Sequence, residues 1–280
     1  LFVFVGIPFN FNTVTFAFAI MIILRIIFEG LQSHYSRVLT STFSTSLQSQ
    51  MFDGMMGARL SFYYNRKVGE LISTLFTSSN ECGGIIAELL ALFKGLFLIT
   101  ASLAAGYLIS IEMTLFILVV SVFALILVKS NYKRINTKSM RHKEVTDEIY
   151  SYELDILSGI KTVKGFNNIN IHKSKLKELL TSYKNLAISI MDTKIYSSMS
   201  LELLLTMMLL AMLWIVVNFF NVSMISLVTV LFIFIQIAPQ VKGVNRSLLG
   251  IKQMTPHLFK VRELIKTSQS EKLPEPSYNL

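Results

Sequence analysis

Apolar runs alternate along this chain with longer stretches of mixed polarity, and the apolar runs have lengths that suit a lipid bilayer. Five mostly apolar segments are predicted to cross the membrane, at residues 13–29, 85–108, 111–128, 195–218 and 222–238. A spanning helix needs about 20 such residues, and about 17 is the lower limit. The pattern therefore predicts an all-α membrane protein with five spans.

The stretches between the spans are predicted to be helical as well. In residues 30–58, apolar side chains recur every four positions, at Tyr35, Leu39, Phe43, Leu47, Met51 and Met55. This spacing marks one face of an α-helix. Residues 9–238 contain no proline, so nothing there forces a helix to break. We expect long helical rods that enter the cytoplasm and return in hairpins near residues 63–69 and 165–171. Amphipathic helices lying on the membrane surface are the alternative.

Composition and charge support a membrane protein and orient it. Hydrophobic residues make up 52% of the chain and charged residues 15%, against about 25% charged residues in soluble domains. The short connections after the second and fourth spans lack Lys and Arg, whereas residues 30–84, 129–194 and 239–280 contain 4, 13 and 7. The positive-inside rule places these long connections and the C-terminus in the cytoplasm. We expect a multi-pass protein of the plasma or inner membrane that does not bind nucleic acid.

Charged residues within the spans are candidates for a substrate cavity, namely Arg25, Lys94 and Glu202. A charge at the centre of a bilayer costs at least about 2.5 kcal/mol. Lys94 has no acid three or four positions away, so either an ion pair with Glu88 or Glu202 or an anionic headgroup would have to compensate its charge. Arg25 and Glu29 have the spacing of an i,i+4 pair.

No catalytic or metal-binding pattern accompanies the spans. The single cysteine, Cys82, excludes an internal disulfide, and the four histidines lack metal-ligand spacing. A Gly-x-x-x-x-Gly-Lys-Ser/Thr phosphate loop is absent from the 280 residues. We therefore assign no catalytic residue, cofactor or metal to this chain itself.

Two segments at the predicted hairpin tips resemble ABC exporters. Residues 62–75 read Phe-Tyr-Tyr-Asn-Arg-Lys-Val-Gly-Glu-Leu-Ile-Ser-Thr-Leu, similar to the first cytoplasmic turn of that family, where an aromatic pair precedes a Val-Gly-Glu-Leu-like stretch. Residues 157–166 read Leu-Ser-Gly-Ile-Lys-Thr-Val-Lys-Gly-Phe and resemble the second turn. A weaker match is Ile-Ala-Pro-Gln at residues 237–240. The resemblance extends from residue 13 to about residue 266.

The resemblance implies an ABC-exporter-type transmembrane helical bundle with long helical cytoplasmic extensions and coupling helices. Residues 1–266 would form this domain without the family's first span, and residues 267–280 would be a linker toward a missing nucleotide-binding domain. ATP and Mg²⁺ would bind that domain, which would make the complete transporter an ATP-hydrolysing translocase. The implied partners are a nucleotide-binding domain, a second transmembrane domain in a homo- or heterodimer, and membrane lipid.

The resemblance also implies which residues couple the ATPase domain to the spans. In the family, the hairpin tips are short coupling helices seated in clefts of the nucleotide-binding domains. At the first tip the corresponding residues are Phe62, Tyr63, Val68, Gly69, Glu70 and Leu71. At the second tip they are Gly159, Ile160, Val163, Lys164 and Phe166.

The sequence thus favours the membrane half of an ATP-driven exporter that moves a lipid, lipid-linked, peptide or amphiphilic substrate by alternating access. An ion-gradient secondary transporter is an alternative from another class. Those folds often carry Gly/Pro-broken helices at the midplane, which the proline-free residues 9–238 do not favour. A regulatory membrane protein on the same scaffold, without transport, is a third hypothesis.

Overall fold

Long helices dominate the computed structural model, which describes residues 11–64, 66–107, 118–119, 121–123, 126, 129–219 and 224–271. Five helices in these ranges have about 30 residues or more, and short helices connect some of them. The elements are α1 (Phe11–Met56), α2 (Ser61–Tyr64), α3 (Val68–Ser73), the π-helical turn η1 (Thr74–Ser78), α4 (Ser79–Tyr107), α6 (Lys129–Ser158), α7 (Ile160–Gly165), α8 (Ile169–Phe219) and α9 (Met224–Ser270). This architecture confirms the predicted all-α bundle.

Several helices are longer than a membrane requires. Helix α8 has 51 residues, and a rise of about 1.5 Å per residue makes it more than twice as long as a hydrocarbon core of about 30 Å. Within the described ranges, three helical stretches are long and apolar enough to cross a membrane: Phe18–Met56, Val68–Ala104 and Ile169–Ala211. Most of the predicted span at residues 111–128 lies outside the described residues, and so do residues 272–280 of the predicted linker.

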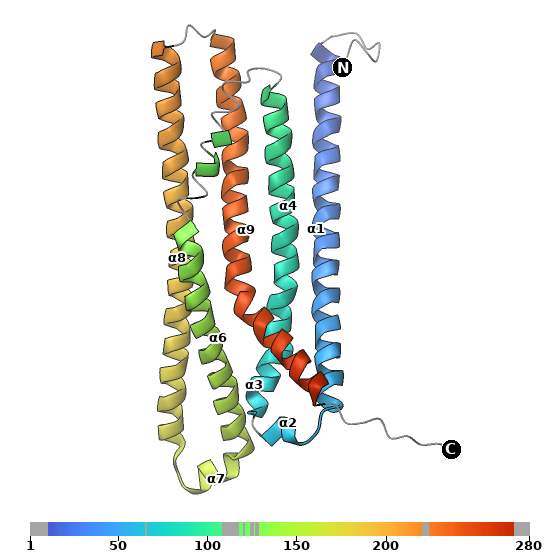
Figure 1. The fold of residues 1–280 in the computed structure, drawn as a ribbon, viewed down its shortest axis with the longest axis vertical. Helices are drawn as coiled ribbons and strands as arrows, with labels where there is room; N and C mark the ends of the chain where they lie inside the picture. The colour runs from blue at the N-terminus through green and yellow to red at the C-terminus, as the bar shows by residue number, and fades with distance from the viewer. Residues whose placement is uncertain are drawn as a thin grey trace, which may run out of the picture.

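The helices form two groups that run along the long axis of the molecule. Figure 1 shows α1 and α4 on one side of α9, and α6 and α8 on the other side. Helix α9 makes its most extensive contacts with α4, and α6 makes its most extensive contacts with α8. The short helix α7 joins α6 to α8 at the same end of the molecule as α2 and α3. Both predicted hairpin tips therefore lie at one end.

Helix α9 is not straight. Pro239 and Pro256 lie inside it, and a proline removes a backbone hydrogen bond and bends a helix. Figure 1 shows the last part of α9 directed toward the foot of α1. This course brings the end of the described chain beside its first hairpin.

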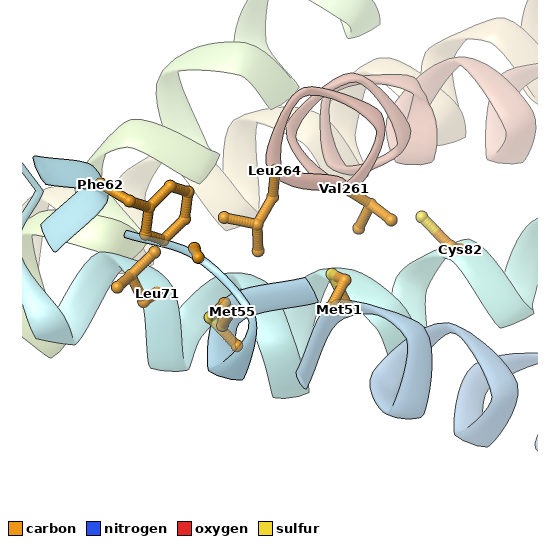
Figure 2. Packing of buried hydrophobic residues seen from close by; sticks show 8 residues of the cluster. Met51, Met55, Phe62, Leu71, Cys82, Val261 and Leu264 are labelled. Carbon is orange, nitrogen blue, oxygen red and sulfur yellow. The ribbon is translucent and has the colours of Figure 1, made fainter. Parts of the chain in front are cut away.

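An apolar cluster at that foot holds five elements together. Figure 2 shows side chains from α1, α2, α3, α4 and α9 packed against one another. The cluster consists of Met51, Met55, Ala58, Phe62, Leu71, Cys82, Val261 and Leu264. Burying one such large apolar side chain contributes about 1.5–3 kcal/mol. A second cluster, including Leu201, Leu205, Ile237 and Val241, joins α8 to α9 nearer the other end.

Candidate functional site

The first hairpin tip is fastened to the bundle by its aromatic pair. Phe62 is only 2% exposed and belongs to the cluster at the foot, and the guanidinium carbon of Arg66 lies 4.2 Å from the centre of its ring. The hydroxyl of Tyr63 donates a 2.7 Å hydrogen bond to the carbonyl oxygen of Met55. Both aromatic side chains therefore contact this chain itself, and the adjacent Tyr64, 83% exposed, is free to contact another molecule.

The Val-Gly-Glu-Leu stretch opens α3 and packs against two long helices. Gly69 lies so close to α6 that a Cβ added there would be 2.7 Å from the carbonyl carbon of Tyr150. Glu70 accepts a 2.9 Å hydrogen bond from Lys260 of α9, and Leu71 is buried in the cluster. Val68 is exposed. Of the four residues, three thus hold the tip in position and one faces outward.

A buried polar network lies directly behind the first tip. Ser73 donates a 2.7 Å hydrogen bond to Asp147 of α6, and Lys143 bonds to the same carboxylate and to Ser73. Burial lowers the pKa of the Lys143 ammonium, and the adjacent Asp147 opposes that shift. Sequence reasoning missed this network. Its one sequence signal is the i,i+4 spacing of Lys143 and Asp147.

A buried histidine adds to this polar layer. The Nδ1 atom of His257 on α9 lies 3.2 Å from the hydroxyl of Ser78 in η1. Burial lowers the pKa of His257 from 6.5 to about 4, and the positive charge of Lys143 adds to the shift. His257 is therefore neutral at pH 7 and ties α9 to the π-helical turn.

The second hairpin tip differs from the first because it buries nothing. No residue of α7 is buried, Lys164 is exposed, and Phe166 is 74% exposed. Asn167 adopts a left-handed conformation with φ of 53°, which asparagine tolerates better than most residues. The chain then turns, and α8 begins at Ile169. The remaining predicted residues, Gly159, Ile160 and Val163, lie in or beside α7 and are half-buried or exposed.

The structure brings two of the three predicted cavity residues together. Arg25 and Lys94 line one cavity of about 860 Å³ between α1, α4 and α9. Glu202 lies on α8, where it pairs with Lys242 of α9 at 3.1 Å. The ion-pair partner expected for Lys94 was Glu88 or Glu202, but the structure places Glu29 of α1 3.7 Å from its Nζ atom. The expected Arg25–Glu29 pair is replaced by this contact between helices.

The side chains that could contact a ligand in the described part of the chain include charged and apolar ones. Its residues contain no group of three or more His, Cys, Asp or Glu side chains that could hold a metal ion. Cys82 is buried in the apolar cluster at the foot. What the arrangement does offer is a charged cavity between α1, α4 and α9, and two hairpin tips that lie at one end of the molecule.

Comparisons with known proteins agree with this geometry. The curated protein "Heterocyst differentiation ATP-binding protein HepA" from Nostoc sp. (strain PCC 7120 / SAG 25.82 / UTEX 2576) is 20% identical over 245 residues, which cover 88% of this chain and 40% of that protein. A solved structure of a bacterial Atm1-family ABC exporter with ATP bound has the same fold, with a TM-score of 0.74 and 15% identity, over 99% of this chain and 50% of the other. The chain spans half or less of the length of these proteins. Residues 4–241 match the family described as ABC transporter transmembrane region, and the chain therefore belongs to this family.

Proposed function

We propose that this chain is the membrane half of an ATP-driven exporter, which moves a lipid, lipid-linked, peptide or amphiphilic substrate by alternating access. The single observation that carries the proposal is mechanical. Helices α1 and α4 run from the cavity to the first tip, and α9 packs against α6, which leads to the second tip at the same end of the molecule. A force applied to the tips from the cytoplasm is transmitted to the cavity because the helices between them are stiff.

The proposed partners are an ATP-binding domain and a second transmembrane domain. ABC transporter transmembrane domains generally pair with both, and the exposed Tyr64, Val68 and Phe166 are the side chains that would enter clefts of the ATP-binding domain. Large aromatic side chains that fill a pocket often dominate the energy of an interface. The buried Phe62, Gly69 and Leu71 would act indirectly, by holding the first tip in place.

The proposal predicts that changing Phe166 will separate ATP hydrolysis from movement of the spans. Truncation of an anchoring aromatic side chain costs about 2 kcal/mol or more of interface energy, whereas a tip without buried residues leaves the fold intact. We expect Phe166→Ala to insert normally and to hydrolyse ATP without closing the cavity. Leu180→Ala is the matched control, because Leu180 is exposed on the same hairpin but lies away from the tip.

A single cysteine in the cavity measures that closure without knowledge of the substrate. Ser102 lines the cavity. In the full-length transporter, with Cys82 and any other native cysteine replaced by serine, the variant Ser102→Cys reports how accessible the cavity is to a maleimide. ATP with vanadate should slow labelling in the parent and in Leu180→Ala, and should have little effect in Phe166→Ala. Equal protection by ATP in all three proteins would remove the second tip from the mechanism.

A further inference from the structure

A second cavity extends the one that holds Arg25 toward the cytoplasmic end. It has a volume of about 470 Å³ and shares Lys94 and Gln240 with the first cavity. It adds two further arginines, Arg37 of α1 and Arg246 of α9. We call the two together the α1–α4–α9 cavity. Four cationic side chains from three helices thus line these two adjoining cavities.

The cations of this space are not balanced by its acids. Its lining contains the carboxylates of Glu29 and Glu88. The Glu29 carboxylate forms an ion pair with Lys94, with 3.7 Å between Oε1 and Nζ. For the arginines at 25, 37 and 246, no carboxylate oxygen of the described residues lies within 4.0 Å. Among the described residues the cavity therefore has an excess of positive charge, and these three guanidinium groups are not paired with a carboxylate.

The lining of this space also contains apolar side chains. Leu98 and Ile235 line it and lie farther from the cytoplasmic end than Lys94 and Arg246 on the same helices. Ile235 is 65% exposed in this chain. Apolar side chains beside cationic ones match a molecule with an anionic head and an aliphatic tail, because such a molecule contacts both kinds of side chain at once.

We propose that the α1–α4–α9 cavity binds an amphiphile with a phosphate-type headgroup. The guanidinium groups of Arg37 and Arg246 meet the headgroup at the cytoplasmic end, Arg25 meets it deeper in the membrane, and the tail lies along Leu98 and Ile235. Arginine suits this role because its planar fork donates two parallel hydrogen bonds to one phosphate. That such a molecule is transported rests on the proposed function, whereas its binding to the cavity does not.

Equilibrium binding of dodecyl phosphate to the purified full-length protein tests the inference. The protein is held in phosphatidylcholine nanodiscs without nucleotide, so the result does not depend on coupling to ATP hydrolysis. We expect Arg246→Gln and Arg37→Gln each to weaken binding about tenfold, the scale of one lost hydrogen bond to a charged group. Arg246→Lys should weaken it less. Arg262→Gln, an exposed arginine of the same helix outside the cavity, should have no effect.

Competition experiments show whether the site recognises the phosphate group alone or the whole amphiphile. Dodecyl maltoside, with the same tail and no charge, should not compete with dodecyl phosphate. Competition by inorganic phosphate at comparable concentration would mean that the site recognises the phosphate group alone, and its absence would mean that the tail is needed. Binding that is unchanged in both glutamine variants, or equally reduced in Arg262→Gln, would overturn the inference. Thermal unfolding of each variant verifies that it is folded.

Discussion

At the scale of single residues, His257 makes stability depend on pH. Its side chain is 7% exposed, and its pKa falls from 6.5 to about 4 on folding. Between those values the unfolded chain binds more protons than the folded chain, so stability is lost as the pH falls. The loss should reach about 2 kcal/mol at pH 5 relative to pH 8. Chemical unfolding of the purified protein at a series of pH values measures it.

The variant His257→Gln should flatten this dependence, because glutamine does not titrate. His34→Gln is the control, since His34 is exposed on α1 and its replacement should leave the slope as it was. An equally steep loss in His257→Gln would assign the acid sensitivity to other groups.

A second prediction at this scale concerns the contribution of Lys143 to stability. Replacing it with methionine leaves the buried Asp147 carboxylate without its cation, which should cost about 3–5 kcal/mol of stability. Lys175→Met, which breaks the exposed pair with Glu178 at 3.4 Å, should cost less than about 1 kcal/mol. The free energy of unfolding measures both changes. Adding Asp147→Asn to Lys143→Met should recover part of the loss, and no recovery would show that the ammonium acts independently of Asp147.

At the scale of elements, the contact of α3 with α6 depends on the absence of a side chain at residue 69. A Cβ there would meet the backbone of Tyr150 and Ser151, and backbone in the middle of a helix cannot move aside. We expect Gly69→Ala to lower stability by about 1–3 kcal/mol. Gly165→Ala, at a glycine with no atom within 4 Å of the added carbon, should be neutral. Equal unfolding midpoints for both variants would contradict this account of the first tip.

The elements also show what the sequence could predict. The four-residue stripe correctly indicated a long first helix, and its last members, Met51 and Met55, are buried in the cluster at the foot. The inward position of Phe62 could not be predicted, since its neighbours Val261 and Leu264 are about two hundred residues away in the chain. Local spacing reports which face of a helix is apolar, but it does not report which helix covers that face.

The same limit applies to the cavity. Its residues Arg25 and Lys94 were found because a charge stands out in an apolar run. The pairing of Lys94 with Glu29 depends on the axial register of α1 against α4, which is set by packing along their whole length. When the register of α1 against α4 is unknown, several carboxylates are equally good partners for Lys94.

At the scale of the whole molecule, the proposed orientation predicts which ends face the cytoplasm. Lys164 at the second tip is exposed, and Tyr107 at the opposite end of α4 is 61% exposed. In intact cells a membrane-impermeant maleimide should label Tyr107→Cys but not Lys164→Cys, and inside-out vesicles should reverse the result. The native Cys82 is 1% exposed and should contribute little background. Labelling of both variants in intact cells would contradict this topology.

The packing of α4 against α9 determines when the helix bundle can assemble during synthesis. Helix α9 begins at Met224, more than a hundred residues after α4 ends at Tyr107. A ribosome adds about 5–20 residues per second, so the newly inserted α4 waits on the order of ten seconds for its main neighbour. During that interval Glu88 lacks the backbone of Gly250 against which it finally lies. Chains whose synthesis stops before Met224 therefore expose this face of α4 to membrane chaperones and proteases.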